Sequence, residues 1–151
     1  MSQSLAKIYV HIVFSTKNRY PFLADKDICD EMHAYLGGIC NKLNSPVLIV
    51  GGVAEHVHTL CILSKNLSAA DFIGEIKRSS SKWVKSKGGV LRKFTWQAGY
   101  GVFSISQSQI EIVRSYIARQ EEHHRKKSFQ DEFRSLLQKY RIEFDERYVW
   151  D

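Results

Sequence analysis

The sequence predicts an α+β fold: a ferredoxin-like (RRM-like) antiparallel sheet with helices on one face, plus a C-terminal tyrosine-bearing helix. Short apolar runs rich in β-branched residues have the composition of strands. Longer segments with apolar residues at helical spacing separate them. The resulting order is strand, helix, strand, strand, helix, strand. The other face of the sheet would be free for a substrate, for the late helices or for a second subunit.

Apolar patterning predicts the first four elements. Residues 8–14 form a β-branched run that predicts a strand, followed by a basic loop. Residues 25–43 carry apolar side chains at helical spacing and predict a helix. Residues 46–50 and 53–63 predict two further strands. The Gly51-Gly52 pair between them predicts the turn of a hairpin.

A capping signal at residues 68–71 predicts the next helix, which Gly88-Gly89 ends. Its predicted inner stripe comprises Phe72, Ile76, Ser79 and Trp83. Residues 94–96 and 100–105 predict short strands around a turn at 99–101.

Two helices and an aromatic tail are predicted for the end of the chain. A second capping signal, at residues 108–111, opens a helix that continues to about His124. Residues 128–140 predict a last amphipathic helix. The tail over 144–150 is too aromatic for a solvated end, so we expect it to pack on the body or on a partner.

Length and composition narrow the class of protein. The chain has 151 residues, and we expect one domain over residues 1–151. A hydrophobic content of 44% argues against a disordered adaptor. A net charge of +6 favours a polyanionic partner. Three cysteines without zinc-site spacing, no membrane-length apolar stretch and no signal peptide favour a reduced, cytoplasmic protein.

His56 and His58 are the most informative residues of the chain. In a strand, alternate side chains project to the same side, so both imidazoles would lie on the open face of the sheet. His11, on the same face of the first strand, is interpreted as structural. Two convergent imidazoles begin a divalent metal site and leave further positions for another donor and for substrate.

Tyr116 and Gln120 lie four residues apart in a predicted helix and therefore share one of its faces. The Gln120 amide oxygen could be the third ligand of Mg²⁺ or Mn²⁺. A tyrosine near such a metal suits phosphotransfer through a phosphotyrosine ester. Tyr100 is the rival nucleophile. The alternative ligands are Glu121, Glu122, His123 and His124.

A basic segment from Ile76 to Ile110 contains seven Lys or Arg residues and no acid. Phosphate contacts beside aromatic residues suit single-stranded nucleic acid. A solvent-exposed basic helix face above aromatic core residues would produce the same sequence pattern. The candidate DNA-binding residues are Lys77, Arg78, Lys82 and Lys85 in this segment, and Lys17 and Arg19 in the first loop.

Several stretches together resemble the small single-tyrosine (HUH-type, TnpA-like) transposases of bacterial insertion sequences. They are YVHIVFSTKNR (9–19), GGVAEHVH (51–58), IKRSSSKW (76–83), WQAGYGVFS (96–104), YIARQEEHH (116–124) and YVW (148–150). One departure is Glu55, where the family pattern has aspartate. We expect this side chain to point away from His56.

The resemblance implies specific roles. His56, His58 and Gln120 would bind Mg²⁺ or Mn²⁺, and Tyr116 would be the nucleophile. The substrate would be single-stranded DNA with hairpins near the element ends, cleaved to leave a 5′-phosphotyrosine and a free 3′-hydroxyl. The family also implies a homodimer. Two other functions stay open, a non-catalytic ferredoxin-like single-stranded nucleic-acid-binding protein and a two-histidine phosphoesterase.

Overall fold

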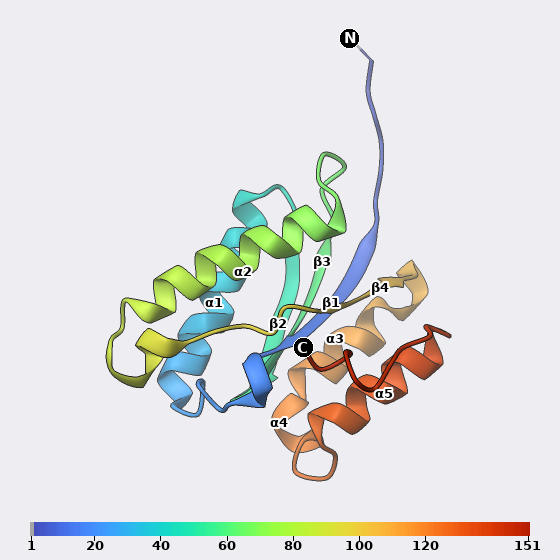
Figure 1. Cartoon of the computed structure of the whole chain (residues 1–151). Helices are drawn as coiled ribbons and strands as arrows, with labels where there is room; N and C mark the ends of the chain where they lie inside the picture. Colours follow the sequence, from blue (N-terminus) through green and yellow to red (C-terminus); the bar gives the residue numbers. More distant parts are fainter. Residues whose placement is uncertain (1) are drawn as a thin grey trace.

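The computed structural model of the chain describes residues 2–151 and has the predicted order of strands and helices (Figure 1). The strands are β1 (Tyr9–Ser15), β2 (Val47–Val53), β3 (His56–Ile62) and β4 (Gly101–Ile105). The α-helices are α1 (Lys26–Lys42), α2 (Ala69–Lys85), α3 (Ile110–Ala118), α4 (Gln120–His123) and α5 (Phe129–Lys139). Short 3-10 turns are η1 (Lys17–Arg19), η2 (Gly89–Lys93) and η3 (Gln107–Gln109).

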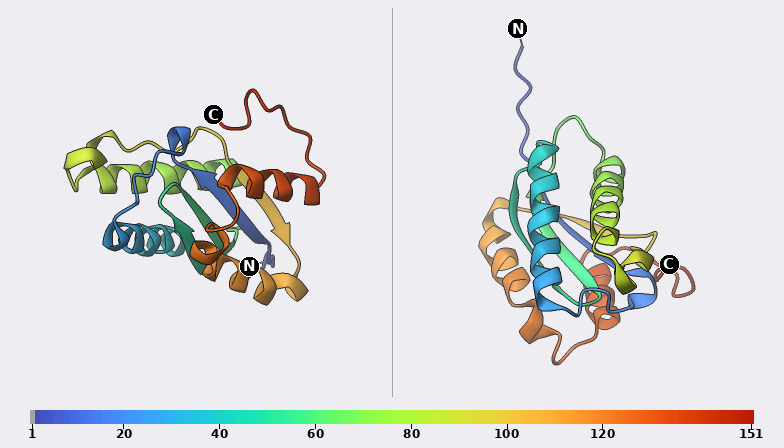
Figure 2. Two further views of the ribbon diagram at one scale, coloured as in Figure 1. Left: turned by 90° about the horizontal axis from the view of Figure 1, so that it is seen from below. Right: turned by 90° about the vertical axis from the view of Figure 1, so that its left-hand side faces the viewer.

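The four strands form one antiparallel sheet in the order β2-β3-β1-β4, which confirms the predicted ferredoxin-like class. Helices α1 and α2 cover one face. Helices α3, α4 and α5 cover the other face (Figures 1 and 2). The late helices therefore occupy the face that the sequence left open to three kinds of occupant.

The sheet has a hydrophobic core on each side. The larger core lies beneath α1 and α2 and includes Phe14, Met32, Leu36, Phe72 and Ile76. On the opposite face, α5 packs on Val13 and Phe103, and α3 packs on Leu60 and Ile105. The residues that these helices bury there are Phe129, Phe133 and Leu137 of α5, and Ile110 and Ile117 of α3. Because apolar burial drives folding, both helical layers are integral to the fold.

The predicted turn at Gly51-Gly52 is wrong, because both glycines lie inside β2 and the turn falls at Ala54-Glu55. A Cβ on Gly51 would stand 2.6 Å from the backbone oxygen of Ile117. The glycine is needed for the close approach of α3 to β2. In the sequence, a glycine required for close packing cannot be distinguished from a glycine that marks a turn.

Residues 94–96 do not form the predicted strand. Phe94 follows η2, and Trp96 makes only an isolated bridge with Thr16. The inner stripe of α2 is also partly displaced: Phe72 and Ile76 are buried as predicted, but Ser80 and Val84 are buried in place of Ser79 and Trp83.

The predicted helix from residue 108 to His124 is divided. It begins as η3, continues as α3 and breaks at Arg119, whose ψ of 24° is not helical, before α4. The tail packs on the body of the protein, which was one of the two arrangements expected for it. Val149 and Trp150 contact the α5 core, and the Asp151 backbone oxygen accepts a 2.9 Å hydrogen bond from the Gly99 N–H.

Two further findings concern expectations from composition. Cys29, Cys40 and Cys61 are buried and free, as expected. Within residues 2–151, every helix is too short or too polar to cross a bilayer.

Candidate metal centre and nucleophile

His56 and His58 project from β3 toward α3, α4 and α5, as strand alternation predicts, and both are fully buried. Each has one ring nitrogen engaged elsewhere. His58 Nδ1 lies 2.8 Å from Nε2 of His11, and His56 Nδ1 lies 3.0 Å from Oε1 of Glu55. These contacts orient both rings so that their Nε2 atoms converge, as the outer partners of metal-binding histidines do.

The Glu55 contact corrects one expectation. The Glu55 side chain was expected to point away from His56, but its carboxylate reaches the His56 ring. The reason is that Glu55 lies in the turn before β3, where strand alternation does not apply. His11 acts as expected, as a structural partner on the same face.

Gln120 and Tyr116 both reach this cluster despite the helix break. Gln120 is 1% exposed, and its Oε1 lies 3.0 Å from His56 Nε2. The Tyr116 ring centroid lies 5.8 Å from that of His58. Tyr100 lies instead before β4, with its ring 5.5 Å from Lys77 Nζ.

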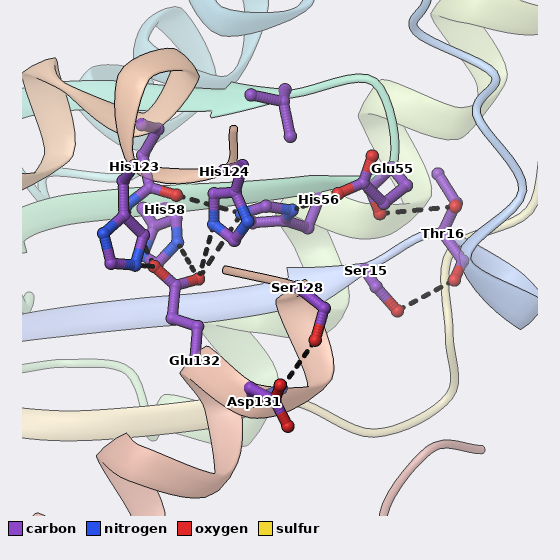
Figure 3. Close-up of polar contacts among 12 residues, drawn as sticks. Ser15, Thr16, Glu55, His56, His58, His123, His124, Ser128, Asp131 and Glu132 are labelled. Atoms are coloured by element: carbon purple, nitrogen blue, oxygen red, sulfur yellow. Dashed lines mark hydrogen bonds and ion pairs between the residues drawn. The ribbon is translucent and has the colours of Figure 1, made fainter. Parts of the chain in front are cut away.

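Glu132, from α5, lies at the centre of the cluster and is 1% exposed (Figure 3). Its Oε1 lies 3.0 Å from His58 Nε2, 3.1 Å from His124 Nε2 and 3.5 Å from His56 Nε2. Its Oε2 accepts hydrogen bonds from the Tyr116 hydroxyl and from Gln120 Nε2.

Sequence reasoning missed Glu132, although a signal existed. The residue lies between Phe129, Phe133 and Leu136 on the apolar stripe of α5, where a carboxylate is out of place without a polar partner. The polar run after Gln120 contains residues that join the cluster and residues that face solvent. His123 and His124 enter the cluster, whereas Glu121 is exposed and pairs with Lys26.

Burial and neighbouring groups set the charge of the cluster. Burial would raise the pKa of the Glu132 carboxyl, but His124, His58 and His56 hold it well below its usual range. Burial lowers the pKa of His58 to about 4, against the opposing pull of Glu132. Burial and the Glu132 charge raise the pKa of Tyr116. At neutral pH the cluster therefore holds a carboxylate, a neutral imidazole at His58 and a protonated phenol.

The donor set fits a divalent cation. Ligand atoms of His56, His58, His124 and Glu132 all lie within 4.8 Å of one another. The buried Nε2 of His124 lies 3.1 Å from Glu132 Oε1 but outside hydrogen-bond geometry, and it has no other hydrogen-bond partner among residues 2–151. Neutral imidazoles and a carboxylate are good ligands for first-row divalent metals. An unpaired buried nitrogen facing them is the group that a cation would satisfy.

The candidate DNA-binding residues lie in different places. Arg78, Lys82 and Lys85 belong to α2, on the opposite side of the sheet from the histidine cluster (Figure 1). The ammonium of Lys77 donates to the backbone oxygens of three residues, Gln97, Ala98 and Gly99, at 2.8, 3.3 and 2.7 Å. Lys77 therefore holds the loop before β4.

Basic side chains also line two pockets beside the cluster. Arg19 lines a pocket of about 510 Å³ that Glu55 and His124 share, and Lys17 precedes it in η1. Tyr116 opens on a second pocket, of about 470 Å³, lined by Arg119, Lys126 and Lys127. These last three residues were not predicted. They provide positive charge where a phosphate would approach the tyrosine.

Comparisons with known proteins agree with this fold. A family model described as "Transposase IS200 like" matches residues 4–120. A candidate transposase from Deinococcus radiodurans R1 is structurally similar, with a TM-score of 0.63 and 21% identity, over 80% of this chain and 98% of that one. A REP-associated tyrosine transposase, solved bound to a REP hairpin, has a TM-score of 0.59 and 15% identity, over 82% and 74%. No curated protein matches the chain.

Proposed function

Because the chain belongs to the IS200-like transposase family, we propose that it cleaves and rejoins single-stranded DNA through a covalent bond to Tyr116. The substrate would carry hairpins near the cleaved ends. The observation that carries this proposal is the convergence of Tyr116, His56, His58 and Gln120 on one buried point.

The cluster supports a chemistry of phosphoryl transfer. His56, His58 and Gln120 would hold Mg²⁺ or Mn²⁺, which would stabilise the negative charge that develops on the scissile phosphate. The Tyr116 hydroxyl would release its proton to water as its oxygen attacks phosphorus to form a 5′-phosphotyrosine, and the 3′ oxygen would leave and take a proton from water. A later attack by a 3′-hydroxyl would reverse this step and release the tyrosine.

The proposed DNA contacts involve both basic regions. Arg19 lines the pocket at His124, whereas Lys17 lines a separate pocket with Lys93. Arg78, Lys82 and Lys85 present charge on α2. Such contacts bind phosphates and position the strand without reading its sequence. We leave Lys77 out of this set, because its ammonium already binds three backbone oxygens.

A denaturing-gel assay tests the reaction. Labelled single-stranded DNA with hairpins from the flanks of the gene would be incubated with Mn²⁺ or with EDTA. We expect a protein–DNA adduct with wild type and Mn²⁺, and none with EDTA or with Tyr116→Phe. An undiminished adduct in Y116F would transfer the nucleophile role to another tyrosine, with Tyr100 as the first candidate. DNA binding without any adduct would favour the non-catalytic alternative.

Mixing inactive variants tests where the tyrosine acts. In this chain Tyr116 lies beside the histidines of the same chain. We therefore propose that each chain completes its own site, whether or not it forms the homodimer that the resemblance implies. A mixture of Tyr116→Phe and His56→Ala should stay inactive. Recovery of the adduct on mixing would instead show that the tyrosine of one subunit serves the histidines of another.

A further inference from the structure

Glu132 lies outside the residues that the family model matches. The family match ends at residue 120, and Glu132 belongs to α5, which begins nine residues later. The surrounding helix is well anchored, because Phe129, Phe133 and Leu137 bury it against Val13 and Phe103. The carboxylate is thereby fixed at the centre of the histidine cluster.

The partners of this carboxylate distinguish a site residue from a structural one. A buried structural carboxylate is ordinarily neutralised by an Arg or Lys side chain. Within residues 2–151, the side chains that contact the Glu132 carboxylate are imidazoles, the Gln120 amide and the Tyr116 hydroxyl. None of these groups carries a permanent positive charge, so a bound divalent cation would neutralise the negative charge of the carboxylate.

The spacing around Oε1 matches that of neighbouring ligands. Two donors at adjacent corners of an octahedral ion, each about 2.1 Å from the metal, lie about 3 Å apart. Oε1 lies 3.0 Å from His58 Nε2 and 3.1 Å from His124 Nε2. The His124 nitrogen approaches this oxygen without hydrogen-bond geometry, as two ligands of one ion would.

The second oxygen faces the nucleophile. Oε2 accepts from the Tyr116 hydroxyl and, at 3.1 Å, from Gln120 Nε2. With its Nε2 held in this way, Gln120 keeps its Oε1 toward His56. One carboxylate therefore reaches the candidate metal ligands through Oε1 and the nucleophile through Oε2.

We propose that Glu132 is a bridging residue that α5 adds to the transposase site. Its Oε1 is a ligand of the divalent cation, and its Oε2 orients the Tyr116 hydroxyl beside that cation. The proposal rests on the proposed function for the role of Tyr116, but its metal-binding half can be tested without DNA.

The first test measures Mn²⁺ binding by calorimetry, and the rise in melting temperature that Mn²⁺ produces, in wild type, Glu132→Gln and Asp131→Asn. Asp131 is exposed and adjoins Glu132 in α5. Asp131→Asn removes the same negative charge as Glu132→Gln, so it is the matched control. We expect affinity to fall in E132Q by at least the roughly 10–100-fold that loss of an outer partner of metal ligands costs, and to stay unchanged in D131N. Wild-type affinity in E132Q would overturn the proposal.

A spectroscopic measurement provides a second test in case E132Q folds poorly. Co²⁺ replaces Mn²⁺, and its visible ligand-field spectrum reports the ligands directly. We expect E132Q and Glu132→Asp, which keeps the charge but shortens the side chain, to change that spectrum, and Y116F to leave it nearly unchanged. Identical spectra for wild type and both Glu132 variants would also overturn the proposal.

The orientation of Tyr116 is tested at saturating Mn²⁺ and DNA. We expect a slower adduct in E132Q with unchanged DNA affinity, and an unchanged rate in D131N. An E132Q rate equal to that of wild type would refute this half. If Y116F still forms the adduct, the proposed function fails, while the Mn²⁺ and Co²⁺ results still decide whether Glu132 is a ligand.

Discussion

His58 is fully buried within the cluster. Its ring contacts His11 at Nδ1 and Glu132 at Nε2, and the rings of His56 and Tyr116 pack against it. Burial lowers its pKa to about 4, so the neutral ring is the form that the fold accommodates. A neutral imidazole is also the form that binds a metal, and structure and ligand role therefore require the same protonation state.

Acid should destabilise the metal-free protein through this residue. The folded-state pKa of His58 lies below its unfolded value of 6.5, so the unfolded chain binds more protons between pH 6.5 and about 4. The contribution of His58 is complete above pH 6.5 and is lost toward pH 4. We expect the free energy of unfolding, measured with urea in EDTA, to fall by about 2 kcal/mol from pH 7 to 5. His58→Gln should show a smaller fall; an equal fall would contradict this account.

The histidine pair could be predicted from sequence, and the carboxylate at its centre was not. His56 and His58 obey strand alternation, which depends only on local geometry. Glu132 is joined to them by the packing of α5 across the sheet, a contact 74 residues apart in the chain. The sequence indicates such a contact only through the position of a charged residue in an apolar stripe, and its histidine partners lie far away in the chain.

At the scale of elements, the approach of α3 to β2 places the nucleophile. Gly51 lets the backbone of Ile117, the neighbour of Tyr116, come close to the strand. The sequence suggested a turn at Gly51-Gly52 because a missing side chain serves a turn and a close approach equally well. The helix break at Arg119 was likewise hidden, because apolar and polar spacing continues across it.

Adding one methyl group at Gly51 should therefore disturb the site. A Cβ there would stand 2.6 Å from the Ile117 oxygen and 2.9 Å from its Cγ2. We expect Gly51→Ala to lose about 1–3 kcal/mol of stability by overpacking, and to slow the adduct by displacing Tyr116. Gly38→Ala is the control, because it lies in α1 with nothing within 4 Å of the added Cβ. Urea midpoints should show G38A stabilised by about 0.5–1 kcal/mol. A neutral G51A would refute the packing argument.

At the scale of the whole molecule, the sheet separates the histidine cluster from the basic side chains of α2. Helices α1 and α2 bury the larger core, and α2 exposes Arg78, Lys82 and Lys85. Helices α3, α4 and α5 lie on the other face, with the cluster (Figures 1 and 2). The order of elements could be predicted because each has its own apolar period. The occupant of the open face could not, since an apolar sheet face accepts its own helices or another subunit equally well.

This separation predicts that charge on α2 affects DNA binding but not the chemistry. The triple variant Arg78→Gln, Lys82→Gln, Lys85→Gln removes three positive charges on the helical layer opposite the cluster. We expect weaker binding of single-stranded DNA, and a slope of log affinity against log salt reduced by up to about 2, at roughly 0.7 per lost phosphate contact. The adduct rate at saturating DNA should not change, because Tyr116 and the metal ligands are untouched.

The control for this variant carries the same change of charge elsewhere. Lys7, Lys42 and Lys65 are exposed and adjoin the end of the sheet at Tyr9 and Ile62, remote from His56. Their replacement by Gln should leave the salt slope near that of wild type. If both triple variants reduce the slope equally, overall charge and not the α2 surface governs binding. If the α2 variant instead lowers the rate at saturating DNA, the strand must run across α2 to reach Tyr116, and the two faces would act as one site.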